Sequence, residues 1–456
     1  MRTKTGNKMK ISFISLGCDK NLVDSEKMLA MMMDKGYEVT DDVTKAEAVV
    51  INTCCFIHDA KQESIDTIIE TAGLKKTGRL KYLIITGCLA TRYHDEIKEF
   101  LPEVDVILSS SAADEMDSAI KKLKAKRLKD KCIIKDINKD PDLGTKRLHN
   151  NLKNYAYIKI AEGCSKHCTY CVIPSIKGEY RSVPFEKIVA EAEDAVKNGK
   201  NELILIAQET TVYGVDLYGK KRLPELLERL NKIEGLEWIR LMYCYPEEID
   251  DELIAAMKLE KVCKYIDMPI QHISDAILKK MGRRTTGADI KRLIKKLRKE
   301  IPGIAIRTSL ITGFPGETEE DHELLLKFIR NYKLDRVGVF TYSKEENTPA
   351  AHFKPVVLKR IKEKRRKELM LAQQDIVFEA NKKLSGKKMD VVIEGYMPED
   401  RVYAARTYRD APDIDGCCFV ETDRELVLGT IMNVKINGAL GYDLTADVPK
   451  TRRFNK

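Results

Sequence analysis

AEGCSKHCTYCVIP, residues 161–174, is the stretch that decides the fold of the central part of the chain. Its three cysteines, Cys164, Cys168 and Cys171, form a C-x3-C-x2-C pattern directly after an apolar run at 157–161. Three thiolates on one short loop suit a [4Fe–4S] cluster, whose four irons need four ligands. With three cysteines one iron stays open, and an open iron can chelate the amino and carboxylate groups of a methionine moiety.

A zinc site is the main alternative for this loop. A C-x2-C pair is typical of structural zinc, which would need a fourth ligand such as His167. His167 stands between Cys164 and Cys168, where it cannot easily turn toward the same metal. The loop therefore favours an iron–sulfur cluster.

The residues that follow predict an open barrel. Six β/α units over 155–343 are typical of a (β/α) barrel that lacks two units, which leaves an open side for a large substrate. A basic helix at 355–383 is expected to close this region. The strand-like runs are 157–161, 202–207, 238–243, 265–270, 304–311 and 336–341.

Polar residues end these runs, where active residues of such folds lie. They are Gln208, Glu209, Tyr243, Gln271, His272, Thr312 and Tyr342. We expect the cofactor contacts among this group and its neighbours, namely Tyr170, Gln208, Gln271, Thr312 and Gly313.

The turn GFPGET at 313–318 follows the fifth run and opens a helix. Thr318 can cap that helix, with Asp321 completing a capping-box-like start. Its glycines either serve the turn alone or let the backbone approach the cofactor.

Residues 9–118 predict a parallel α/β sheet with helices on both faces. The strand-like runs are 11–15, 48–52, 82–86 and 104–108. A helix at 25–35 is expected to start at a Ser25 cap and to stop before Gly36. Its methionines are expected to pack in the core; they are Met28, Met31, Met32 and Met33.

One cysteine follows each of the first three of these runs. Cys18, Cys54 and Cys88 lie 36 and 34 residues apart, about one βα repeat each. Equivalent strand ends lie side by side in a parallel sheet, so the three thiols converge. They can hold a second cluster with an open iron; the alternative is three buried cysteines in βα turns.

The other cysteines lack partners at useful spacing and are expected to pack. Cys55 is adjacent to Cys54, and neighbours on an extended chain point opposite ways. The remaining five are Cys132, Cys244, Cys263, Cys417 and Cys418.

Bulk composition indicates a soluble cytosolic protein. The 456 residues suggest about three domains of roughly 150 residues each. No apolar leader follows the polar start MRTKTGNKMK, and no run approaches the ~18 apolar residues of a membrane span. Clustered cysteines in a reducing compartment are more often metal ligands than disulfides.

From 385 onward, short runs at 390–394, 418–421 and 431–436 predict a small antiparallel, barrel-like β module.

Two three-cysteine sets ahead of a small β module resemble the methylthiotransferase family of radical S-adenosylmethionine enzymes. The resemblance implies an N-terminal methylthiotransferase domain at 9–125, a radical core at 150–382 and a TRAM module at 383–449. It also implies two [4Fe–4S] clusters and two S-adenosylmethionine molecules per turnover. One molecule donates a methyl group to sulfur, and the other yields the 5′-deoxyadenosyl radical that removes a hydrogen atom. A reductant such as flavodoxin or ferredoxin would supply the electron.

Six strings resemble the branch that modifies the β-carbon of an aspartate in the twelfth protein of the small ribosomal subunit. Asp19 stands where the commoner first motif has Pro, and Ala405-Arg406 where the commoner last one has Gly-Arg. The strings are LGCDKNLVDSE (16–26), AKQESIDTI (60–68), LYGKKRLPEL (217–226), MPIQH (268–272), DRVGVFTYS (335–343) and RTYRDAPDIDG (406–416).

Charge supports a protein substrate. The chain carries +9 overall, with basic stretches at 119–153 and 354–388, yet 385–449 holds seven Lys/Arg against twelve Asp/Glu. A module that grips tRNA phosphates should be basic, whereas an acidic one suits a basic ribosomal protein. The acids singled out are Asp410, Asp413, Asp415, Glu421, Asp423 and Glu425.

The basic linker and the tail at 450–456 leave room for contact with ribosomal RNA. Two alternatives stay open. One is the same chemistry on tRNA adenosine. The other is a non-catalytic iron–sulfur protein that transfers electrons or binds the ribosome.

Overall fold

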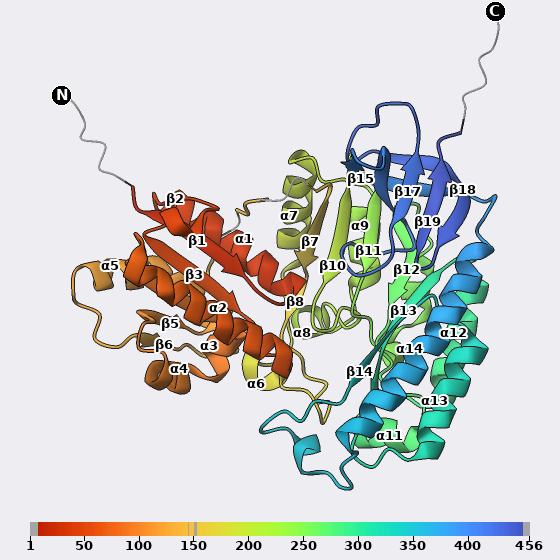
Figure 1. The fold of residues 1–456 in the computed structure, drawn as a ribbon, viewed down its shortest axis with the longest axis horizontal. Coiled ribbons are helices and arrows are strands. Elements are labelled where there is room, and N and C mark those ends of the chain that lie inside the picture. The colour runs from red at the N-terminus through yellow and green to blue at the C-terminus, as the bar shows by residue number, and fades with distance from the viewer. Residues whose placement is uncertain (1–7, 145, 150–152, 450–456) are drawn as a thin grey trace, which may run out of the picture. The chain divides into compact units, whose positions relative to one another are not determined.

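The computed structural model describes residues 8–144, 146–149 and 153–449 (Figure 1). The chain divides into two compact units, one built mainly from residues up to 191 and one mainly from residues after 191. Within the described ranges, no helix combines the length and apolar character needed to cross a membrane.

The first unit is built on a six-stranded parallel sheet in the order β2-β1-β3-β4-β5-β6 (Figure 1). The four predicted strands are present, and the structure adds two short edge strands, β2 and β6. The bounds are β1 Lys10–Ser15, β2 Glu38–Val39, β3 Ala48–Thr53, β4 Tyr82–Gly87, β5 Val106–Leu108 and β6 Cys132–Ile133.

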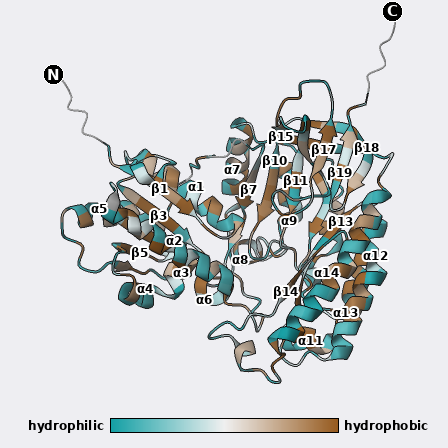
Figure 2. Ribbon diagram, in the orientation of Figure 1, coloured by the Kyte–Doolittle hydropathy of each residue, from teal (hydrophilic) through white to brown (hydrophobic). Residues whose placement is uncertain are grey.

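Helices cover both faces of this sheet, as the alternation of apolar runs and helical segments predicts. Each face has its own hydrophobic core: Ile51, Leu83 and Ile85 lie in one, and Ile11 and Val50 in the other (Figure 2). The helices are α1 Asp19–Asp34, α2 His58–Thr77, α3 Cys88–Arg92, α4 His94–Phe100 and α5 Met116–Lys124, with 3-10 turns η1 Val43–Lys45 and η2 Ser110–Glu115.

The first helix starts earlier than predicted. Cys18 occupies the N-cap position of α1, so Ser25 is an interior residue and the expected Ser25 cap is wrong. Ser25 is buried, and its hydroxyl donates to Ser15 Oγ and accepts from Asn52 Nδ2, both at 3.0 Å. The methionine prediction is confirmed for Met28 and Met32, which are buried, and for Met31, which is partly buried against the same core, whereas Met33 is exposed.

A second parallel sheet has the order β14-β13-β12-β11-β10-β7 (Figure 1). Neighbouring strands are also successive in the chain, apart from short insertions, which is the order of a partial (β/α) barrel. All six predicted strands are present. They are β7 Tyr155–Lys159, β10 Glu202–Ile206, β11 Trp238–Leu241, β12 Val262–Asp267, β13 Ala305–Thr312 and β14 Arg336–Thr341. A two-stranded antiparallel ribbon, β8 Ala161–Glu162 with β9 Arg181–Ser182, flanks the cysteine loop.

The helices between these strands complete the β/α pattern. The predicted basic helix is α14. It begins at Lys359, later than the predicted start at 355, and the residues before it are extended or lie in turns. The helices are α6 Ile173–Lys177, α7 Phe185–Lys197, α8 Val215–Tyr218, α9 Leu223–Leu230, α10 Asp251–Ala256, α11 Asp275–Lys280, α12 Gly287–Glu300, α13 Glu319–Tyr332 and α14 Lys359–Lys382, with η3 Pro246–Glu248 and η4 Pro349–His352.

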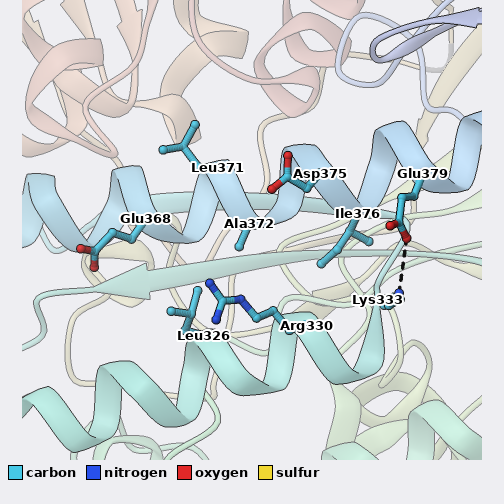
Figure 3. A pocket seen from close by; sticks show the side chains of 9 residues that line it. All are labelled: Leu326, Arg330, Lys333, Glu368, Leu371, Ala372, Asp375, Ile376 and Glu379. Carbon is cyan, nitrogen blue, oxygen red and sulfur yellow. Dashed lines mark hydrogen bonds and ion pairs between the residues drawn. The ribbon is translucent and has the colours of Figure 1, made fainter.

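A groove of about 560 Å³ runs between α13 and α14 (Figure 3). Ala372 and Ile376 of α14 and Leu326 and Arg330 of α13 line it. It lies between outer helices, and none of the cysteines or strand-end residues predicted to form the site lines it. We assign it no role in the chemistry.

The C-terminal module is a closed five-stranded barrel in the order β15-β16-β17-β19-β18. The predicted antiparallel pairing holds except between β17 and β19, which run parallel. Closure leaves no free strand edge. The strands are β15 Lys388–Met397, β16 Val402–Thr407, β17 Cys418–Glu421, β18 Ile431–Leu440 and β19 Asp443–Asp447.

A buried ion cluster joins this module to the partial barrel within the second unit. Glu202 at the start of β10 accepts from Arg240 Nε at 2.9 Å and from both terminal nitrogens of Arg406 at 2.5 and 3.2 Å. All three side chains are almost fully buried. Arg240 also donates to the Tyr408 carbonyl at 2.8 Å.

Three of the acids expected to attract a basic partner instead bind the barrel. Asp410 accepts from Arg336 Nε at 3.0 Å, Asp413 from Lys153 and from the Tyr155 hydroxyl at 2.7 Å each, and Asp415 from the Tyr265 hydroxyl at 3.0 Å. The side chains of Asp410 and Asp415 are almost fully buried in these contacts, so for these two the partner-binding interpretation is wrong. Asp413 stays exposed beside Lys153, and its contact with a partner stays a prediction. Glu421, Asp423 and Glu425 are exposed. The tail at 450–456, singled out for RNA contact, lies outside the described residues.

We expect Glu202→Gln to lower the free energy of unfolding by about 3–5 kcal/mol, because it leaves the buried guanidinium of Arg240 without its carboxylate and that of Arg406 with Glu394 alone. Chemical denaturation followed by fluorescence of Trp238, which is near this cluster, measures it. The control is Glu300→Gln, which removes the surface pair of Glu300 with Lys258. An equal loss in both variants would contradict the role given to the buried cluster.

The same cluster makes stability depend on acid. Burial raises the pKa of Glu202, but Arg406 and Arg240 outweigh burial and hold that pKa below its ordinary value of 4.5. A lowered folded-state pKa contributes stability that is fully present above pH 4.5 and is lost as the pH falls through the lower value. We therefore expect the difference in free energy of unfolding between the natural chain and Glu202→Gln to become smaller as the pH falls below 4.5.

Candidate functional site

Three of the predicted cysteines follow three adjacent strands of the first unit. Cys18 follows β1 and caps α1, Cys54 follows β3, and Cys88 follows β4 and begins α3. Because β1, β3 and β4 are neighbours and run parallel, their carboxyl ends meet at one edge of the sheet. The structure thus brings together the three turns that were expected to converge.

Close packing brings two of these turns into contact. Gly17 has φ +86°, and a Cβ added there would lie 2.5 Å from Cys54 Cβ and 2.7 Å from Cys54 Sγ. Electrostatic effects also link all three thiols, since the charge of Cys18 raises the pKa of both Cys54 and Cys88. Cys18 is exposed, whereas Cys54 and Cys88 are buried.

Hydrogen bonds hold the turns in place. Asn21 donates from Nδ2 to the carbonyls of Leu16 at 2.9 Å and Thr53 at 3.1 Å. Asn52 Nδ2 donates back to the Asn21 carbonyl at 2.9 Å. Ser64 accepts from the Cys54 amide at 3.0 Å and donates to the Cys54 carbonyl at 2.8 Å. The thiols therefore stand on a braced backbone.

Burial opposes ionisation of these thiols. It raises the pKa of Cys54, and it raises the pKa of Cys88 well above the usual value, while the nearby Lys177 charge lowers the pKa of Cys88. Thiolates are the form that binds iron, so binding of a metal centre would release protons from these groups.

The cysteine loop of 164–171 is anchored at its middle. Thr169 donates from its amide to the Met281 carbonyl at 3.0 Å and from its hydroxyl to the Lys280 carbonyl at 2.8 Å. Cys168 Sγ lies 3.3 Å from the Tyr245 hydroxyl. His167, the residue weighed as a zinc ligand, is exposed with φ 52°.

Helix α6 directly after this loop packs beside the other cysteine set. Val172 and Ile176 belong to the same hydrophobic core as Cys88 and Leu89. Lys177, the last residue of α6, is buried and affects the pKa of Cys88. The sequence analysis missed this contact; the apolar spacing of Val172 and Ile176 was the available signal.

Among the described residues, no three His, Cys, Asp or Glu side chains form a group ready to bind one metal ion. A [4Fe–4S] cluster attaches each cysteine to a different iron, so its ligands stand farther apart than those of a single ion. Both candidate sets supply thiols alone, the donor that iron–sulfur clusters require. The all-sulfur donor set fits such a cluster.

The strand-end residues fall into two groups. Thr312 is fully buried and donates to Glu317 at 3.2 Å, and the Gly313 amide donates to Glu317 at 2.7 Å. A Cβ on Gly313 would lie 2.3 Å from Lys362 Cγ, so Lys362 fills the space beside this glycine. These two residues hold the turn in place, and their contact with a cofactor stays a prediction. The capping box of Thr318 and Asp321 is present as expected.

Tyr170, Gln208 and Gln271 are partly buried, and their contact with a cofactor also stays a prediction. Tyr170 packs against Phe314 with ring centroids 6.3 Å apart. Gln271 has φ 70°, a left-handed conformation that turns the chain after β12. Glu209, His272 and Tyr342 are buried, and Tyr243 has φ 61° at the end of β11.

Arg283, in the turn between α11 and α12, is a further candidate for the site outside the predicted set. Its guanidinium lies 4.1 Å from the Tyr245 ring centroid, and its NH2 donates to the Pro269 carbonyl at 3.1 Å. Among the described residues, none forms a hydrogen bond with its buried Nε and NH1. No local motif around Arg283 marks this position.

The remaining cysteines mostly pack, as predicted. Cys55 lies in the core of the first unit. Cys244, Cys263 and Cys418 are buried, and Cys132 is partly buried. Cys417 is exposed, so its interpretation as a packing residue is wrong.

We expect Gly17→Ala to remove about four of the roughly eight irons that two clusters would hold. The added methyl group would collide with Cys54. The matched control is Gly36→Ala, since Gly36 has a similar φ of +90° but nothing within 4 Å. Iron and sulfide quantification on anaerobically purified protein measures the loss. Equal iron in both variants would contradict the placement.

Comparison with known families assigns three segments. Residues 158–329 match the radical SAM superfamily, 386–448 match the TRAM domain, and 10–109 match the family described as Uncharacterized protein family UPF0004. Among solved structures, the radical S-adenosylmethionine methyltransferase TsrM from Kitasatospora setae is 15% identical with a TM-score of 0.55, covering 75% of this chain and 77% of TsrM. That likeness shows the fold alone.

Curated relatives are much closer in sequence. "Ribosomal protein uS12 methylthiotransferase RimO" of Lachnoclostridium phytofermentans is 56% identical over 437 residues, covering 96% of this chain and 99% of the relative. The protein of the same name from Acetivibrio thermocellus is 47% identical over 447 residues, covering 97% and 98%. With identity this high over almost the whole length, and with radical SAM and TRAM segments in the expected order, the chain belongs to the RimO family of methylthiotransferases.

Proposed function

We propose that this protein transfers a methylthio group to the β-carbon of an aspartate in ribosomal protein uS12, using two [4Fe–4S] clusters and S-adenosylmethionine in the cytoplasm. The name of the relatives gives ribosomal protein uS12 as the protein that they modify. The observation that carries the proposal is the presence of two separate cysteine triplets, one spread over the carboxyl ends of three parallel strands and one on the single loop that follows β7 and β8.

The cofactors would supply electron transfer, the carbon radical and the sulfur, and the protein would supply position and exclusion of water. Cys164, Cys168 and Cys171 would hold the cluster that binds S-adenosylmethionine. Gln208, Gln271 and the unpartnered nitrogens of Arg283 are the polar groups that we assign to binding of that molecule. Cys18, Cys54 and Cys88 would hold the cluster that carries the sulfur.

Several residues would keep reactants in place. Thr169 fixes the middle of the cysteine loop through bonds to Met281 and Lys280. Tyr245 lies within hydrogen-bond distance of Cys168. Such fixed geometry matters because a primary carbon radical would otherwise take hydrogen from the nearest C–H bond. A low-potential donor such as flavodoxin or ferredoxin is the reductant that this chemistry requires.

The exposed acids of the C-terminal module provide a contact for a basic ribosomal protein. Glu421, Asp423 and Glu425 lie on one short segment, 421–428, which also exposes Val427 and Leu428. Opposite charge on the partner would steer association and set register. Other acids of the module, such as Asp410 and Asp415, form contacts with the barrel. We therefore assign substrate binding to the segment 421–428.

We expect Cys168→Ala to abolish formation of 5′-deoxyadenosine and to leave the cluster of Cys18, Cys54 and Cys88 in place. Iron content should fall by about half, because one of two four-iron centres is lost. Cys417→Ser, an exposed thiol outside both triplets, is the control and should keep full iron. Liquid chromatography with mass spectrometry measures the nucleoside. Normal 5′-deoxyadenosine from Cys168→Ala would overturn the assignment.

We expect Glu421→Lys/Asp423→Lys/Glu425→Lys to lower kcat/KM for methylthiolation of uS12 at least several-fold, through the association rate. Uncoupled 5′-deoxyadenosine production should not change, because the barrel is untouched. Mass spectrometry of uS12 from cells that carry only this variant gives a second readout. If cells lacking the enzyme lost a 2-methylthio nucleoside of tRNA and kept the uS12 modification, the substrate assignment would be wrong.

A further inference from the structure

A buried cluster of four charged side chains lies within the first unit. Lys159 Nζ lies 2.6 Å from Glu162 Oε2 and also pairs with Asp24. Lys177 Nζ lies 3.6 Å from each of the same two carboxylates. All four side chains are at most 18% exposed. Two cations and two anions balance, which is the condition for burying charges.

Lys177 is the member of this cluster that lies on the helix packed against the helix of Cys88. It ends α6, which contacts α3, the helix that begins at Cys88. Ile176, the preceding residue, packs in the same core as Cys88. The charge of Lys177 lowers the pKa of Cys88, and Cys88 and Cys18 act on Lys177 in return. Lys159 carries the same charge and the same two partners.

We propose that Lys177 is a positioning residue for the cluster of Cys18, Cys54 and Cys88, where its fixed positive charge stabilises the thiolate-bound centre and favours its reduced state. This inference rests on the proposed function, because it requires the second cluster to exist. Asp24 and Glu162 hold the ammonium group in place.

The physical reason is the balance of charge around the centre. Three thiolates bring three negative charges to the site, and burial of Cys54 and Cys88 disfavours negative charge there. Reduction adds one more electron. Net charge around a cluster and contacts with its ligands set its reduction potential. A buried cation therefore favours the reduced centre and also favours an anionic sulfur ligand on the open iron.

The experiment uses the full chain with Cys164, Cys168 and Cys171 all changed to Ala, so that one cluster is observed alone. In this background, Lys177→Met should bind the same iron and sulfide but show a lower midpoint potential in a redox titration followed by electron paramagnetic resonance. At a fixed poise, the ratio of reduced to oxidised centre should fall roughly tenfold, the size expected from Coulomb's law for a unit charge about 10 Å away at an effective dielectric constant of about 20. Lys177→Arg should restore most of the potential.

Two further variants separate this role from simple folding. Lys159→Met removes an equal charge from the same cluster, but from the end of β7 instead of from α6, and should shift the potential less. Glu162→Gln/Lys177→Gln removes one charge of each sign, which preserves neutrality among the buried groups, and should still lower the potential.

The outcomes are distinct. If the background protein holds no cluster, the two-cluster proposal fails and this inference fails with it. If the cluster is present and its potential in Lys177→Met or in Glu162→Gln/Lys177→Gln equals that of the background, the role of Lys177 alone is overturned. An equal shift in Lys159→Met would also overturn it, because the effect would then belong to the whole charge cluster.

Discussion

The contact between α6 and α3 is the constraint on which the arrangement of the candidate site depends. Helix α6 starts two residues after Cys171, and α3 starts at Cys88. Val172 and Ile176 share a hydrophobic core with Cys88 and Leu89, so the chain that leaves one cysteine triplet is packed against a member of the other. Apolar burial has no preferred direction. Here it holds the short segment after Cys171 against the helix that begins at Cys88, so each side of the contact is directly next to a cysteine in the chain.

A second constraint acts at the C-terminal module. Glu202 and two arginines form a buried cluster that joins β10 to β16, and Asp410, Asp413 and Asp415 add further pairs with the barrel. Buried ion pairs contribute little net stability compared with apolar packing. Any arrangement that leaves one of their charges buried and unpaired is, however, strongly destabilised. Their main effect is therefore to select one orientation of the module on the barrel.

Local patterns in the sequence predicted much of the fold and the positions of both triplets. The alternation of apolar runs and helices predicted every strand of the partial barrel, and the regular spacing of Cys18, Cys54 and Cys88 predicted turns at one sheet edge. Contacts between distant residues could not be predicted this way. Asp413 pairs with Lys153 across 260 positions, and nothing near either residue marks the other. The prediction that Ser25 caps a helix failed for a related reason, because its hydroxyl forms hydrogen bonds with Ser15 and Asn52 of the neighbouring strands instead of with its own helix.

The attachment of the C-terminal module restricts how the domains of this chain can be exchanged with those of a relative. Arg406 and Asp410 from the module meet Glu202 and Arg336 from the barrel, so each side carries both signs of charge. A chimera that joined the barrel of this chain to the module of a relative would have to keep all four groups matched. Exchange of the module is thus constrained by a small ionic interface that includes none of the proposed cluster cysteines.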